Sequence, residues 1–197
     1  MFEKRTKWKI VRVTAFWVFV GYLYIHRDDI FEDLRHMMRE SKWEQEEPRG
    51  TLIDGKKNGE WITYFTNERP AKVENYRNDT LHGPQIRYTP DGVLQFRGKY
   101  NMGMLVDSAF SYYGNGKLNY MHCYDSAGTF HGPFSIYEPN GQLTQSGQYT
   151  NGKYDGEFRR YFTTGEIREI QHYDMGQRVG LWIKFSPAGD TLEVEHY

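Results

Sequence analysis

The sequence predicts a mainly β protein, an elongated antiparallel β-meander of six hairpin repeats that follows a transmembrane helix and a short amphipathic helix. Three observations support this prediction. The 197 residues include 16 Tyr, 12 Phe and 20 Gly, a mixture typical of short strands joined by turns. A spacing of 24 residues recurs as far as the C-terminus, and one uncharged apolar stretch lies near the N-terminus. We therefore divide the chain into an anchor (residues 1–27), a helix with a linker (28–49) and a repeat domain (50–197).

The anchor is predicted from residues 13–25, which carry no charge and are extended toward the N-terminus by Ile10 and Val11. A spanning helix usually needs about 20 apolar residues at a rise of roughly 1.5 Å each. This run is shorter, so we expect Arg12 to reach the headgroups with its charged end and Trp8 to lie at the interface. The residues assigned to the membrane anchor are Trp8, Arg12, Phe16, Trp17, Phe19, Tyr22 and Tyr24.

Two alternatives stay open for this stretch, a cleaved signal peptide and a helix buried in a partner protein. The residues that follow, 26–29, offer no small-x-small cleavage site, which disfavours the signal peptide. If the helix spans, the five bases against one acid in the first twelve residues favour the cytoplasmic or matrix side for the N-terminus. The repeats would then be exoplasmic, periplasmic or in the intermembrane space.

Residues 28–43 show the spacing of an amphipathic helix. Ile30, Leu34 and Met37 fall on one stripe, with Phe31 and Met38 beside it. An aspartate at position 28 or 29 can cap the start, and the acidic stretch that leads to a proline at position 48 is expected to end the helix and form a linker. This segment is either a stalk that rests on the membrane or on its own domain, or a helix that binds a partner.

The 24-residue period is marked by one glycine in each copy. Successive key residues are 24 residues apart, except for one step of 25, and Asp107 takes the place of glycine in the third copy. Chance does not plausibly produce such a series. The key glycines are Gly59, Gly83, Gly132, Gly156 and Gly180. We number the copies 1 to 6 by these key residues.

Two aromatic positions recur with the same period. The first lies five residues after the key residue and holds Tyr64, Tyr88, Tyr112, Tyr137, Tyr161 and Phe185. The second lies seventeen residues after it and holds Tyr76, Tyr100, Tyr124, Tyr149, Tyr173 and Tyr197. Identical aromatic residues one repeat apart can stack along a sheet.

Turn signals divide each copy into two strands of about seven residues. A glycine follows nine residues after the key residue in every copy except the first, which has Glu68. Residues 91–92, 115–116, 140–141 and 151–152 are Asp-Gly or Asn-Gly pairs, which favour hairpin turns because they tolerate positive φ. Two strands in each of six copies predict about twelve strands, and neighbouring copies must bury one another because a single hairpin is unstable.

Three segments resemble a known family. Residues 54–65 (DGKKNGEWITYF), 151–167 (NGKYDGEFRRYFTTGEI) and 175–185 (MGQRVGLWIKF) resemble MORN repeats, specifically the variant class found in bacterial antitoxin-like proteins. The resemblance covers roughly residues 50–197, and copy 3 departs most from it because residues 102–109 lack the Gly-Glu-aromatic core. It implies a β-sheet scaffold for protein contacts or, in some members, for membrane lipids, and it implies no common catalytic residues. The anchor lies outside it.

We predict no metal site. His82 and His131 share a repeat position directly before the key glycine. Metal ligands must converge within about 2.0 to 2.1 Å of one ion, whereas copies two apart are separated by several strands at about 4.7 to 4.9 Å each. We interpret both histidines as polar residues that flank a turn.

We predict neither catalytic residues nor a cofactor. Cys123 and His122 are adjacent, so in a strand they point to opposite faces and cannot form a nucleophile and base pair. Glu60 and Glu157 share a repeat position, which indicates a role in the repeat rather than in acid and base catalysis. No phosphate-binding glycine loop or nucleophile elbow is present, and we expect no small-molecule substrate.

The charge balance disfavours a nucleic-acid partner. Residues 28–50 carry eight acids against four bases, and residues 51–197 carry seventeen against fifteen. A single-layer meander, by contrast, has two faces and cannot hide all of its aromatic residues without a partner or its own helix. We therefore expect protein partners, with lipid contacts limited to the N-terminal helix.

Three functions are compatible with this reading. The first is a non-enzymatic single-pass scaffold, an accessory or assembly subunit of a multiprotein complex in the bacterial envelope or of a respiratory chain complex in the mitochondrial inner membrane. The second is an antitoxin or immunity protein that binds a toxin, although such an inhibitor usually has no need of an anchor. The third is a tether to a lipid surface, which the slight excess of acids disfavours.

Overall fold

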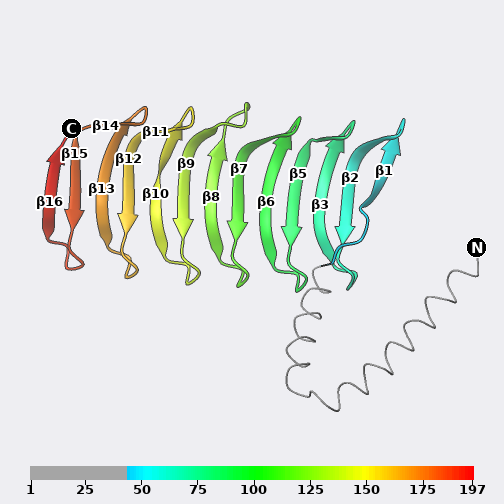
Figure 1. Ribbon diagram of the computed structural model, residues 1–197, viewed down its shortest axis with the longest axis horizontal. Helices are drawn as coiled ribbons and strands as arrows, with labels where there is room; N and C mark the ends of the chain where they lie inside the picture. The colour runs from blue at the N-terminus through cyan, green and yellow to red at the C-terminus, as the bar shows by residue number, and fades with distance from the viewer. Residues whose placement is uncertain (1–43) are drawn as a thin grey trace, which may run out of the picture. The chain divides into compact units, whose positions relative to one another are not determined.

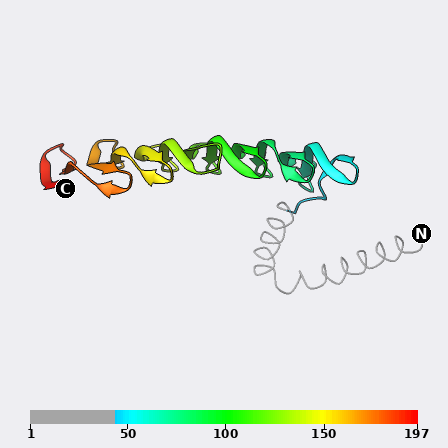
Figure 2. The same ribbon diagram turned by 90° about the horizontal axis from the view of Figure 1, so that it is seen from above.

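The computed structural model describes residues 44–197, and residues Gln45–Tyr197 form one compact unit. This unit is a single antiparallel sheet, seen face-on in Figure 1 and from above in Figure 2. The predicted anchor and the predicted amphipathic helix over 28–43 lie outside the described residues. Within the described range the secondary structure is β throughout, and no helix there is long and apolar enough to cross a membrane.

The sheet contains sixteen strands. In chain order they are β1 (Arg49–Ile53), β2 (Lys56–Tyr64), β3 (Pro70–Arg77), β4 (Thr80–Leu81), β5 (Gly83–Tyr88), β6 (Leu94–Asn101), β7 (Met104–Tyr112), β8 (Leu118–Tyr124), β9 (Phe130–Tyr137), β10 (Leu143–Thr150), β11 (Lys153–Tyr154), β12 (Gly156–Tyr161), β13 (Ile167–Asp174), β14 (Gln177–Arg178), β15 (Leu181–Phe185) and β16 (Thr191–His196). Successive long strands are neighbours, so the topology is a meander without crossovers.

The strand count exceeds the expected twelve for two reasons. In copies 2, 5 and 6 the first strand is interrupted beside the key glycine, which separates the short strands β4, β11 and β14 from β5, β12 and β15. In addition, β1 pairs with the outer edge of β2, ahead of copy 1. Gly50 makes this pairing feasible, because a Cβ there would lie 2.4 Å from the Trp61 ring. The mainly β antiparallel meander is therefore confirmed, with one strand more than the repeats supply.

The turns between copies all lie at one end of the strands, which we call the turn edge. Four of these, and the turn from β1 to β2 ahead of copy 1, are two-residue turns in which both residues have positive φ, as type I′ hairpins require. They are 54–55, 78–79, 102–103, 151–152 and 175–176. Between copies 3 and 4 the turn instead has three residues, 126–128, closed by a hydrogen bond from the Asp125 N–H to the Thr129 carbonyl (2.9 Å). This extra residue accounts for the single step of 25.

The turns inside each copy lie at the other end of the strands, which we call the loop edge. In copy 1 the Phe65 N–H donates to the Arg69 carbonyl and the Glu68 N–H to the Phe65 carbonyl, at 2.8 and 2.9 Å. The same pair of bonds recurs in all six copies. This is the three-residue hairpin loop whose last residue is left-handed. The loops are 66–68, 90–92, 114–116, 139–141, 163–165 and 187–189.

Each hairpin also carries a β-bulge beside its first repeat tyrosine. In copy 1 the register passes from Thr63 opposite Lys72 to Tyr64 opposite Pro70, which leaves Ala71 without a direct partner. The same shift occurs in every copy. The bulged residues are Ala71, Gln95, Asn119, Thr144, Arg168 and Leu192. A bulge bends its strand and increases the local twist, so this device repeats along the loop edge.

Candidate interaction surface

All six key residues adopt the left-handed conformation. Their φ values lie between 61° and 116°, and Asp107 of copy 3 has the 61° value despite its side chain. Glu68, which replaces glycine nine residues after the key position, likewise has a φ of 66°. The backbone geometry therefore repeats even where glycine is absent. The key glycines Gly59, Gly83, Gly132, Gly156 and Gly180 fix the backbone and leave no side chain for chemistry.

The two sets of repeat tyrosines lie on opposite faces of the sheet. Cross-strand partners share a face, and Gly59 pairs with Tyr76 whereas Tyr64 pairs with Pro70 on the other side of the pleat. The ladder face carries Tyr76, Tyr100, Tyr124, Tyr149, Tyr173 and Tyr197. The reverse face carries Tyr64, Tyr88, Tyr112, Tyr137, Tyr161 and Phe185. Both faces are open to a partner as far as the described residues are concerned.

A ladder of aromatic rings runs along the ladder face through copies 4 to 6. The centroid distances are 5.1 Å from Phe130 to Tyr149, 4.8 Å from Tyr149 to Tyr154 and 5.3 Å from Tyr154 to Tyr173. The series continues through Trp182 to Tyr197 at 5.3 and 5.0 Å. Such pairs add about 0.5–1.5 kcal/mol each beyond burial.

One buried position of the ladder face was not predicted from the sequence. The residue two after the key position is buried in all six copies and is aromatic in four of them; the six residues are Trp61, Gln85, Ala109, Phe134, Phe158 and Trp182. The aromatic residue of the Gly-Glu-aromatic pattern occupies this position, so the pattern could have revealed it. The bulged residues were also missed, because their types share nothing that would reveal the position.

Copies 1 and 2 hold a buried polar network on the ladder face, and copy 5 has a counterpart in which Gln171 donates to Glu169 at 2.6 Å and Tyr173 donates to Gln171 at 3.0 Å. The Glu74 carboxylate accepts hydrogen bonds from the Gln85 amide (2.7 Å) and the Tyr76 hydroxyl (3.1 Å), and the Lys72 ammonium lies 3.2 Å away. Burial, together with the Glu74 charge, raises the pKa of Tyr76 to about 12. The Tyr76 hydroxyl therefore stays protonated and donates to the carboxylate at neutral pH.

Cations cover both ends of the ladder face. The Lys57 ammonium lies 4.5 Å from the Trp61 ring centre, and the Arg178 guanidinium lies 4.2 Å from that of Trp182. Both occupy the position two residues before the key residue, where the inner copies carry Leu81, Leu105, Phe130 and Tyr154. Cation–π contacts near the protein surface are worth about 0.5–1 kcal/mol each.

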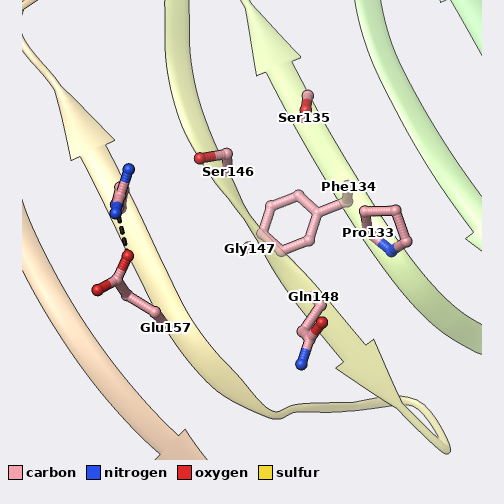
Figure 3. A pocket seen from close by; sticks show the side chains of 8 residues that line it. Pro133, Phe134, Ser135, Ser146, Gly147, Gln148 and Glu157 are labelled. Carbon is pink, nitrogen blue, oxygen red and sulfur yellow. Dashed lines mark hydrogen bonds and ion pairs between the residues drawn. The ribbon is translucent and has the colours of Figure 1, made fainter.

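The reverse face has an uncharged patch across copies 3 and 4, which includes Leu118, Met121, Tyr137 and Leu143. At its margin the Arg97 guanidinium covers the Phe110 ring, 4.2 Å from the ring centre. All four side chains of the patch are half-buried, and the ion pairs Lys99–Asp107 and Arg159–Glu157 lie toward the two sides of the patch. At one side Ser135 opposes Ser146, where other copies have larger residues. The small pair leaves an open hollow of about 390 Å³, shown in Figure 3.

The residues considered for chemistry do not come together. Cys123 lies 3.3 Å from the Ser108 hydroxyl, whereas the His122 ring packs on the ladder face against Phe130 and Phe134. Burial lowers the pKa of His122. Among residues 44–197 no three His, Cys, Asp or Glu side chains are grouped as metal ligands. The Glu157 carboxylate, in copy 5, accepts a hydrogen bond from the Arg159 guanidinium at 2.5 Å, whereas Glu60 lies far away in the sheet, in copy 1.

Comparison with known proteins identifies the repeat. The family model described as a MORN repeat variant matches residues 81–102, 130–151 and 154–175. These segments fall in copies 2, 4 and 5 and have the same hairpin geometry as the others. Copies 2, 4 and 5 are MORN repeats of the variant type. The predicted anchor residues lie outside the matched segments and outside the described residues.

No curated protein matches the sequence. Among solved structures, one titled "Crystal structure of GtfA/B complex bound to UDP and GlcNAc" is 12% identical over 63% of this chain, with a TM-score of 0.27. The matched part covers 23% of the length of that chain. At this TM-score the likeness supports no argument about the MORN sheet.

Proposed function

We propose that the chain is a non-enzymatic, single-pass membrane scaffold, an accessory or assembly subunit of a multiprotein complex. The observation that carries the proposal is the uncharged patch on the reverse face. A single-layer sheet leaves this patch without a covering layer from the described residues. The centre of a protein interface is typically depleted of charge and surrounded by a polar rim, which matches the patch and the ion pairs toward its sides.

The membrane part of the proposal rests on the N-terminal sequence. Residues 13–25 would span with the basic N-terminus in the cytoplasm or matrix, which would place the MORN repeats in the periplasm or the intermembrane space. A bacterial envelope assembly and a respiratory chain complex of the mitochondrial inner membrane both suit this arrangement. In either setting the anchor would pack among other spans while the sheet holds a neighbouring subunit.

The test is extraction of the tagged full-length protein from its native membranes in mild detergent, followed by size separation and identification of co-migrating proteins. We expect stoichiometric co-migration with a large membrane assembly. The variant Met121→Glu, which places a carboxylate in the patch, should lose this co-migration. The matched control is Val73→Glu, a half-buried residue at the same repeat position in copy 1, which should retain it.

Two other outcomes would replace the proposal. A protein that is released without detergent and co-migrates with one small toxin would support the antitoxin function. Binding to anionic vesicles without any protein partner would support a lipid tether. The described part carries 19 acids against 16 bases from residue 45 onward, which disfavours the tether.

A further inference from the structure

We propose that a groove at the loop edge of copies 4 to 6 binds an extended peptide of a partner protein that presents an acidic residue beside a large apolar one. This surface is separate from the uncharged patch. Two adjoining hollows, of about 430 and 440 Å³, share Phe162 and Arg168 as lining residues. Together they form a groove that extends to both sides of Arg168.

The repeat itself shows that this groove is not a necessary feature of the fold. In copies 1 and 2 the equivalent residues, Phe65 and Pro90, are both fully buried. The bulged residue there is Ala71, which is itself buried. In copies 5 and 6 the corresponding Phe162 and Pro187 line an open hollow, and the bulged residue is Arg168. Replacement of a small bulged residue by arginine thus accompanies the change from a closed edge to an open one.

Among the described residues, two charged side chains that line the groove have no ion pair, the cation Arg168 and the acid Glu138. The Arg160 guanidinium lies 3.3 Å from the Glu169 carboxylate, and the Lys184 ammonium lies 2.5 Å from that of Glu193. Arg168 is exposed and has no ion pair with any residue from 44 onward. A guanidinium presents donors in a planar fork that matches a carboxylate. The groove therefore favours a ligand with a carboxylate at this point.

The walls beside Arg168 favour a large apolar group next to that carboxylate. The hollow toward copy 6 is lined by Phe162, Phe185, Pro187 and Leu192, and Leu192 is 68% exposed. Covering exposed apolar side chains with an apolar part of a ligand lowers the free energy of the complex. The second hollow, toward copies 3 and 4, has a polar lining that includes the Glu138 carboxylate and the hydroxyls of Tyr113 and Thr144, which donate to backbone carbonyls. A ligand that fills both must be elongated and change from apolar to polar along its length, which fits an extended peptide better than a lipid headgroup.

The test is selection of binders from a random peptide display library by the full-length protein in lipid nanodiscs. We expect the wild-type protein to enrich peptides with Asp or Glu adjacent to Phe, Leu, Trp or another large apolar residue. Charge reversal by Arg168→Glu should shift the enrichment to Lys or Arg at that place. For an enriched synthetic peptide, Arg168→Gln should weaken the affinity by at least about tenfold, as loss of a charge-assisted bond predicts.

The matched control is Gln95→Glu, which adds a carboxylate at the bulged position of copy 2, outside the groove. It should select the same acidic peptides as the wild-type protein. The proposal is overturned if no acidic-apolar motif is enriched or if Arg168→Glu leaves the selection unchanged. It is also overturned if the Arg168-dependent binding is to vesicles of phosphatidylcholine and phosphatidylglycerol rather than to peptides. Failure here leaves the scaffold proposal intact, because that one depends on the effect of Met121→Glu.

Discussion

Copies 4 to 6 and copies 1 to 3 share one backbone but differ in what fills the ladder face. In copies 4 to 6 the rings from Phe130 to Tyr197 form an unbroken series of contacts, beside one buried polar pair, Glu169 and Gln171. In copies 1 to 3 Gln85 and Ala109 stand where rings stand elsewhere, and the Glu74 network takes up part of the space. Turn geometry thus defines the repeat, whereas packing on the ladder face varies between copies.

This difference suggests where stability resides. A repeat array is held together by each copy and by its interfaces with neighbours, so local differences in packing become local differences in stability. Aromatic contacts tolerate small shifts, whereas a buried polar network depends on every partner. We therefore expect the aromatic contacts and the polar networks to respond to different kinds of substitution.

The largest effect is expected for Phe134→Ala, which gives copy 4 the residue that copy 3 already has. Phe134 is 2% exposed and contacts Tyr149, Tyr154 and Phe158. Loss of such a ring should lower the free energy of unfolding by about 3–5 kcal/mol, because it removes buried surface and leaves a cavity. Urea denaturation of the full-length protein in detergent, followed by tryptophan fluorescence, measures this. A loss below about 1 kcal/mol would show that the ladder adds little to stability.

A smaller decrease in the free energy of unfolding, about 1–3 kcal/mol, is expected for Gln85→Leu in the Glu74 network. This variant removes the amide that donates to Glu74 at 2.7 Å and leaves a buried carboxylate with fewer partners. The double variant Glu74→Leu with Gln85→Leu should recover part of the loss, since replacing both partners by apolar groups leaves no orphaned charge. If the double variant is less stable than the single one, the carboxylate is held mainly by Lys72 and Tyr76.

The positions of the turns could be predicted from the sequence, whereas the packing of the side chains could not. A position with left-handed backbone conformation favours Gly, Asn or Asp, so the turns can be recognised directly in the sequence. The bulged position accepts Ala71, Gln95 and Arg168 alike, because a bulge is a backbone feature and requires no particular residue type. Arg168 at that position lines the groove, so the register was needed to place this arginine there.

A modest gain in stability is expected for Glu68→Gly, which restores glycine in the loop of copy 1. Glu68 has a φ of 66°, and its side chain is exposed. Relief of the left-handed strain should raise the free energy of unfolding by up to about 1 kcal/mol. Thermal unfolding by circular dichroism measures this, with Glu68→Ala as the control that keeps the strain. Equal stability of the two variants would mean that this loop carries no strain.

The smallest effect is expected from His122, at the junction of the two halves. Its ring packs against Tyr120, Phe130, Phe134 and Tyr149 at centroid distances of 4.9 to 6.3 Å. Its Nδ1 has no hydrogen-bond partner among the described residues. Burial lowers its pKa in the folded protein below the value of about 6.5 in the unfolded chain. As the pH falls below about 6.5, the unfolded state therefore gains a proton before the folded state does, and stability declines.

His122→Phe keeps an aromatic ring but cannot be protonated, so it should remove this part of the decline between pH 7.5 and 5. Because carboxylates also titrate toward pH 5, the informative quantity is the difference between the two unfolding free energies at each pH. We expect the wild-type protein to lose stability relative to the variant as the pH falls. The opposite slope would mean that the surrounding rings stabilise the imidazolium through cation–π contacts by more than burial disfavours it, and that the ladder tolerates a cation at its centre as it does at its two ends.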